Sequence, residues 1–77
     1  MQSSIYTSRY RDHDIRIVGI GMLDGWHLAV QIKPAWQAPW PTWRDRETRY
    51  EDFDEVKTAG MAWARKAIDE RLPVLHR

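Results

Sequence analysis

The stretch IRIVGIGMLDGWHLAVQIK, residues 15–33, decides the fold because it predicts two strands joined by a tight turn. Asp24-Gly25 is the strongest short-range hairpin signal, since a type I′ turn needs positive φ at both central residues. Residues 15–22 are apolar apart from Arg16 and two glycines, and residues 26–33 alternate apolar and polar side chains. We therefore expect strands over 15–22 and 26–33, paired so that Leu23 faces Trp26.

That register gathers the large apolar side chains on one face of the hairpin. This core face consists of Ile15, Ile17, Leu23, Trp26, Leu28, Val30 and Ile32. Gly19 and Gly21 leave a bare patch in it, and we expect Trp63, from the C-terminal segment, to cover the patch. The opposite face carries a second apolar group, formed by Val18, Ile20 and Met22.

Two further segments predict strands. Residues 5–11 are rich in β-branched and aromatic types, and DHD at 12–14 has the composition of a turn. Residues 44–50 alternate charged side chains on both sides, which is typical of an exposed edge strand protected from aggregation. The sequence leaves open whether residues 44–50 pair with the sheet or project as an arm.

The last third of the chain predicts a helix over residues 53–72. Asp52 and Glu55 have the spacing of a capping box, and Pro73 marks the end. The expected buried stripe of this helix consists of Val56, Gly60, Trp63 and Ala67, flanked by Ala59 and Ala64. The chain is thus predicted to be a single α+β domain over residues 1–77, in two layers: a twisted antiparallel sheet of three to four strands with one C-terminal helix packed on it.

Composition bounds the partners. Twelve basic and eleven acidic residues give a net charge of +1, whereas a dedicated duplex-DNA binder usually has a clear basic excess. The sequence has no cysteine, and its N-terminal residues lack the apolar core of a secretory signal. No apolar run approaches the roughly 20 residues that span a bilayer. We expect a cytoplasmic protein without a membrane partner.

The segment PAWQAPWPTW, residues 34–43, holds three tryptophans and three prolines in ten positions. Pro39 and Pro41 exclude a helix there, so the segment should be extended. Its rings have two interpretations: a strap that buries Trp36, Trp40 and Trp43 to enlarge a small core, or a displayed surface that binds a partner. A mixed arrangement, with one ring exposed and the others buried, is the third.

Catalytic and metal-binding patterns are missing from the sequence. Gly19-Ile20-Gly21 has the wrong spacing for a phosphate loop and is followed by a strand. Asp12-His13-Asp14 is better explained as a turn than as a metal site, and no nucleophile–base pair can be argued from spacing. We therefore expect no enzyme activity, no catalytic residue, no metal site and no cofactor.

The order of elements over residues 15–72, with DGW at the hairpin and a helix that opens with DFDEVKTAG, resembles the HicB-type antitoxin domain in layout. Those domains have a short proline-acidic turn where this chain has PAWQAPWPTW. The layout carries no diagnostic motif, so no site residue is assigned from it.

The function expected from the sequence is that of a small non-enzymatic interaction domain. Binding of a protein partner, or self-association, is favoured, either through the Trp/Pro segment or through the apolar reverse face. The candidate binding residues are Trp36, Trp40, Trp43, Arg44, Arg46, Val18, Ile20 and Met22. The alternative is single-stranded nucleic-acid binding by tryptophan stacking and contacts from Arg9, Arg11, Arg44, Arg46 and Arg49.

Overall fold

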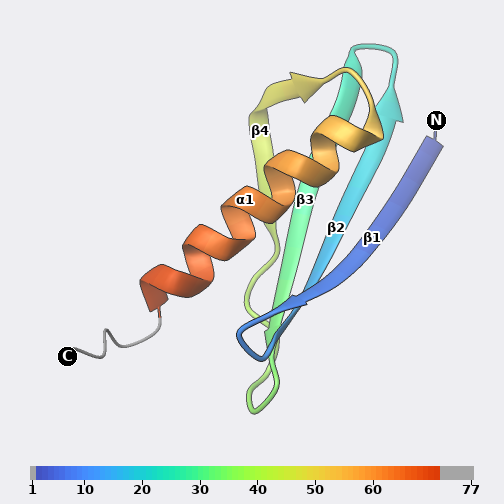
Figure 1. Cartoon of the computed structure of the whole chain (residues 1–77). Coiled ribbons are helices and arrows are strands. Elements are labelled where there is room, and N and C mark those ends of the chain that lie inside the picture. Colours follow the sequence, from blue (N-terminus) through green and yellow to red (C-terminus); the bar gives the residue numbers. More distant parts are fainter. Residues whose placement is uncertain (1, 72–77) are drawn as a thin grey trace.

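The computed structural model describes residues 2–71 and contains one antiparallel sheet with one helix on it (Figure 1). The strands are β1 (Gln2–Tyr10), β2 (His13–Met22), β3 (Gly25–Pro34) and β4 (Trp43–Tyr50), and the helix is α1 (Phe53–Arg71). The sheet order is β1-β2-β3-β4, so each strand pairs with its neighbour in sequence. The predicted α+β class and two-layer arrangement are confirmed. Leu72 and Pro73, at the predicted end of the helix, lie outside the described residues.

The first turn comes one residue earlier than predicted. Tyr10 pairs with His13, so Arg11 and Asp12 form the turn, with φ of 50° and 63°. Positive φ at both central residues is the geometry of a type I′ turn, which Asp tolerates better than most residues. His13 is therefore part of β2 rather than of the turn, and it is buried, with 2% of its surface exposed. Its Nδ1–H donates to the carbonyl oxygen of Arg11 at 2.7 Å.

The second turn shifts the predicted register by two residues. Met22 pairs with Gly25 across Leu23 and Asp24, and Gly21 lies opposite Trp26. Only Gly25 has positive φ in this turn, at 120°, so the predicted type I′ turn at Asp24-Gly25 is wrong. A shift of two residues keeps every side chain on its predicted face, whereas a shift of one would have exchanged the faces. Leu23 is the exception, because it sits in the turn and is fully exposed.

β4 pairs with the sheet, which settles the alternative left open by the sequence. Ala29 pairs with Arg44 and Trp26 with Tyr50, with an irregularity between these points. The Asp45 carboxylate stabilises the irregular part by accepting the N–H groups of Glu47 and Thr48, both at 3.0 Å. The Tyr50 hydroxyl donates to the same carboxylate at 2.8 Å.

The helix is capped as predicted but buries a different stripe. The Asp52 side chain accepts the Glu55 N–H at 2.9 Å, and Glu55 in turn accepts the Glu51 N–H at 2.9 Å. The buried residues of α1 are Val56, Gly60, Ala64 and Ile68. Trp63 and Ala67, expected in this stripe, pack at its side. The core between helix and sheet consists of Val56, Ala64 and Ile68 from α1 with Ile15, Ile17, Leu28, Val30 and Ile32 from the sheet.

The bare patch at Gly19 and Gly21 is filled by side chains other than Trp63. A methyl group added at Gly19 would come within 2.6 Å of the Phe53 ring, and one at Gly21 within 2.9 Å of the Trp26 ring. The prediction that Trp63 covers this patch is therefore wrong. Trp63 instead stacks on Trp43, with ring centroids 4.2 Å apart and planes 9° apart.

Candidate functional site

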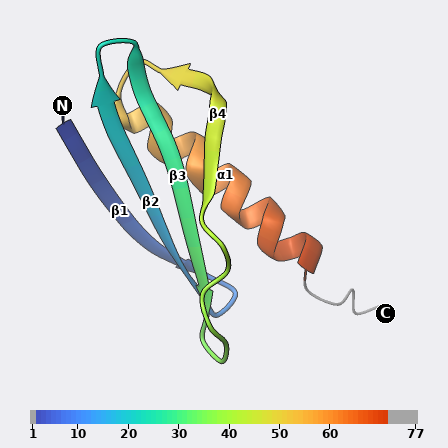
Figure 2. The ribbon, with the colours of Figure 1, turned by 180° about the vertical axis from the view of Figure 1, so that it is seen from behind.

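The face of the sheet opposite α1 is covered by no other element among residues 2–71 (Figure 2). We call it the open face. Its central row runs across all four strands, because Ile5 pairs with Val18, Val18 with Ala29 and Ala29 with Arg44. Ile5 is 52% exposed and Met22 51% exposed, and Val18 and Ile20 between them are half-buried. Contiguous exposed apolar side chains of this kind typically mark an interaction surface.

Basic side chains frame the open face at both ends. A shallow hollow of about 670 Å³ at one end is lined in part by Arg9, Arg16 and Lys33. A second hollow, of about 370 Å³, brings Arg44, Arg46 and Arg49 together with Ile20 and Met22. Each hollow also has an acidic residue in its lining, Asp14 in the first and Asp45 in the second.

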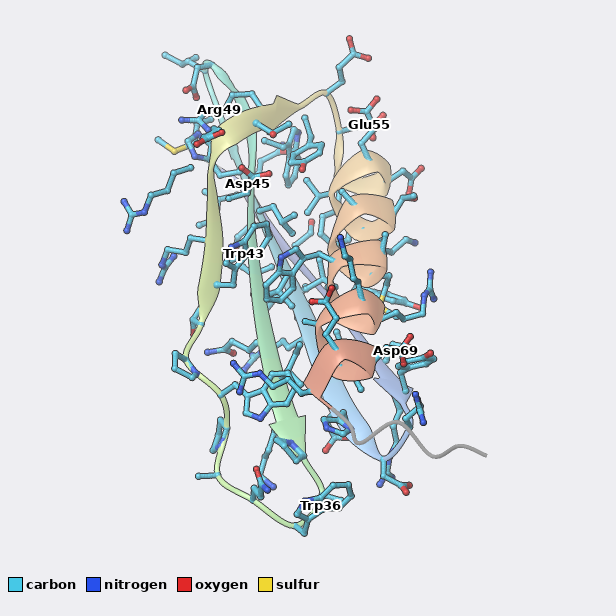
Figure 3. All side chains as sticks on the ribbon, turned by 90° about the vertical axis from the view of Figure 1, so that its left-hand side faces the viewer. Trp36, Trp43, Asp45, Arg49, Glu55 and Asp69 are labelled. Carbon is cyan, nitrogen blue, oxygen red and sulfur yellow. The ribbon has the colours of Figure 1, made fainter. Side chains whose placement is uncertain are left out.

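The helix carries charges of both signs, and its basic residues are Lys57, Arg65, Lys66 and Arg71. Glu51 and Asp52 precede α1, Asp54 and Glu55 occupy its first turn, and Asp69 and Glu70 lie near its end. Asp69 lies near the end of α1, whereas Asp45 and Arg49 belong to β4 (Figure 3). The net charge of +1 therefore conceals a basic open face, next to a helix whose acidic and basic residues balance.

Ion pairs hold part of this basic frame in place. The Asp24 carboxylate accepts hydrogen bonds from His27 Nε2 and Arg49 Nε, each at 3.0 Å. The hydrogen bond from His27, followed by that from Arg49, lowers the pKa of Asp24 to about 2. Burial alone raises the pKa of the Asp45 carboxyl, but the donors Thr48, Glu47 and Tyr50 outweigh it, so this pKa lies below its usual value. Both carboxylates are thus ionised at neutral pH.

Arg11 does not join the basic frame. Its guanidinium donates to Asp69 Oδ1 at 2.8 Å, on the helix side of the sheet. The Tyr10 hydroxyl donates to the same carboxylate at 3.0 Å. The hydrogen bond from Arg11 is the main reason that the pKa of Asp69 lies below its usual value. The first turn is thereby tied to the end of α1.

The Trp/Pro segment lies along the edge of β3 and not over the open face. The Trp40 N–H donates to the Ile32 carbonyl oxygen at 2.8 Å. This bond occupies the edge of β3 just before β4 begins at Trp43. Trp40 and Trp43 are half-buried and pack against the core. Trp36 is 58% exposed at the tip of the loop, with its ring 5.5 Å from that of His13 (Figure 3).

Replacing Trp40 by alanine should lower the free energy of unfolding by about 2 kcal/mol, because its ring packs on the core, on His13 and under the Arg71 guanidinium. Trp36→Ala should change it by at most about 0.5 kcal/mol, since that ring is mostly in water. Urea unfolding followed by circular dichroism measures both. An equal loss in the two variants would contradict the different burial of the two rings.

The predicted binding residues thus divide into two groups. Val18, Ile20, Met22, Arg44 and Arg46 meet on the open face. Trp36, Trp40 and Trp43 belong to the other side and the loop. Sequence reasoning did not include Ile5 and Lys33 in the site. The alternation of the first strand could have indicated Ile5, because its position matches that of Arg9 and Thr7 on one face.

Within residues 2–71, no group of three or more His, Asp or Glu side chains is placed to hold a metal ion. The helix in this part of the chain is also not long and apolar enough to cross a membrane. Comparisons with protein-family models, with curated proteins and with solved structures found no match to this chain.

Proposed function

We propose that this chain is a non-enzymatic interaction domain that binds a protein partner through the open face. The observation that carries the proposal is the uncovered apolar row: Ile5 and Met22 are more than half exposed beside Val18 and Ile20. The other face of the same sheet packs against α1 to form the core, and this row lies outside that core. The absence of cysteine in the sequence suits the cytoplasmic location expected for the protein.

The frame of Arg and Lys residues defines the chemistry of that partner. A matching surface would carry an apolar centre, to cover the Ile5–Val18 row, and acidic groups around it. Such complementarity steers the encounter and selects among partners more than it adds affinity. Arginine is also enriched in interface hot spots, and three arginines surround Ile20 and Met22.

The test is site-specific photo-crosslinking in a native extract. A benzophenone amino acid replaces Met22 on the open face, and in the control it replaces Ala62, which is exposed on α1. We expect discrete protein adducts at position 22 that survive nuclease treatment and are lost when Ile20→Glu is added. The same adducts at both positions, or none at position 22, would overturn the proposal.

Single-stranded nucleic-acid binding is the second candidate, and the concentration of basic side chains on the open face favours it. Phosphates would contact Arg9, Arg16 and Lys33 at one end and the three arginines at the other. Stacking would depend mainly on Trp36, the most exposed tryptophan of the Trp/Pro segment. Adducts that disappear with nuclease, together with affinity that falls steeply as salt rises, would favour this candidate over a protein partner.

A further inference from the structure

The two edges of the sheet are protected very differently. β4 carries charges along most of its length, Arg44 to Arg49, and two of its N–H groups are bonded to its own Asp45 side chain. Its pairing is also irregular. These are the features by which natural proteins prevent an edge strand from pairing with another chain. β4 is therefore a closed edge.

β1 lacks this protection over most of its length, with Arg9 as its one charged residue. Its residues Gln2 to Ser8 read QSSIYTS and contain no charge, no proline and no glycine. Ile5, Tyr6 and Thr7 are strand-favouring residues, and all three are exposed. In the sheet order β1 is terminal, so one row of its backbone groups has no strand beside it among residues 2–71. A strand of this kind is a template for pairing with a further strand.

The turn geometry identifies which backbone groups point outward. The Ala35 N–H donates to the Asp12 carbonyl oxygen, so even-numbered residues of β2 bond to β3. Antiparallel ladders alternate, so odd-numbered residues of β2 bond to even-numbered residues of β1. The N–H and C=O groups of Ser3, Ile5, Thr7 and Arg9 therefore face the free edge.

We propose that a second copy of this chain pairs with that edge, β1 against β1, antiparallel across a two-fold axis at Ile5. The two-fold places Ile5 opposite Ile5 and Ser3 opposite Thr7, and all of these residues carry outward-facing groups. Because residues opposite each other point to the same face, both helices lie on one side of the joined sheet. Gln2 to Ser8 contains no charged residue, so no like charges face each other across these pairs.

We assign a second copy of this chain to the free edge of β1 because this strand is complementary to itself. An isologous interface must be complementary to itself, and a neutral strand with a bonding pattern that matches its own reverse meets that condition. The pairing would also cover part of Ile5, which is 52% exposed in one chain. The apolar rows of the two open faces would then join into one. This inference does not depend on the identity of any other partner.

The test combines the mass in solution with hydrogen exchange. Sedimentation of the full chain should give twice the 9.2 kDa of one copy. Exchange measured by NMR should show slow amides at Ile5 and Thr7 that become fast on dilution, whereas Ser4, Tyr6 and Ser8 stay slow. Ile5→Lys, which sets two ammonium groups against each other, and Thr7→Pro, which removes only an outward N–H, should each halve the mass.

Met22→Lys is the matched control, because it adds the same charge to the open face on β2, beyond the last β1–β2 pair at Gly21, and should leave the dimer intact. A monomer, or fast exchange at Ile5 and Thr7 at every concentration, would overturn the proposal. So would a dimer that survives both β1 variants or dissociates with Met22→Lys. If a variant fails to fold, the exchange pattern of the unmodified chain still decides the question.

Discussion

Replacing Gly60 by valine is expected to lower the free energy of unfolding by about 3 kcal/mol, at the upper end of what overpacking a core costs. Gly60 lies where α1 packs closely on the sheet. A Cβ there would lie 2.7 and 2.9 Å from two methyl carbons of Ile17 and 3.1 Å from Leu28. Ile17 is fully buried, so it has no free space into which to move. The helix must then shift away from the core.

Ala62→Val is the control for this substitution. Ala62 is exposed on the same helix, so valine there should cost only the difference in helix propensity, about 0.5 kcal/mol. Thermal or urea unfolding of both variants separates the two effects. Equal losses would mean that Gly60 is present for reasons other than close contact with Ile17.

The fold could be predicted from the sequence because the alternation of apolar side chains assigns the faces of the sheet correctly even when the turn is misplaced. The predicted hairpin turn at Asp24-Gly25 is displaced, yet Ile17, Val30 and Ile32 reach the core as expected. Side chains alternate along a strand, so a register that is wrong by two residues preserves the faces. The capping pair Asp52 and Glu55 is equally local, and it was predicted correctly.

Contacts between distant segments could not be predicted in the same way. That Phe53 covers Gly19 depends on where the helix begins relative to the sheet, which local patterns do not specify. The basic open face could not be predicted from the sequence for a similar reason. Arg9, Lys33 and Arg46 are far apart in sequence, and only strand pairing brings their side chains to one face. Net charge carries no information about such an arrangement.

Replacing Trp63 by alanine is expected to cost about 3 kcal/mol, the lower end for removal of a large aromatic, because the ring is half-buried. The stacked partner Trp43 begins β4, so the pair joins the helix to the last strand. A double-mutant cycle with Trp43→Ala should give a coupling of about 1 kcal/mol. A cycle with Gly19→Ala should give none, since Phe53 and Trp26 cover that glycine.

The same substitution links the fold to the proposed site. Trp43 points inward, so the next residue, Arg44, points to the open face opposite Ala29. Loss of the Trp43–Trp63 stack should loosen β4 and with it the arginines around Ile20 and Met22. We therefore expect Trp63→Ala, although it lies on the far side of the sheet, to weaken crosslinking from position 22 under conditions in which the chain is still folded. Unchanged crosslinking together with unchanged stability would show that the stack does not position β4.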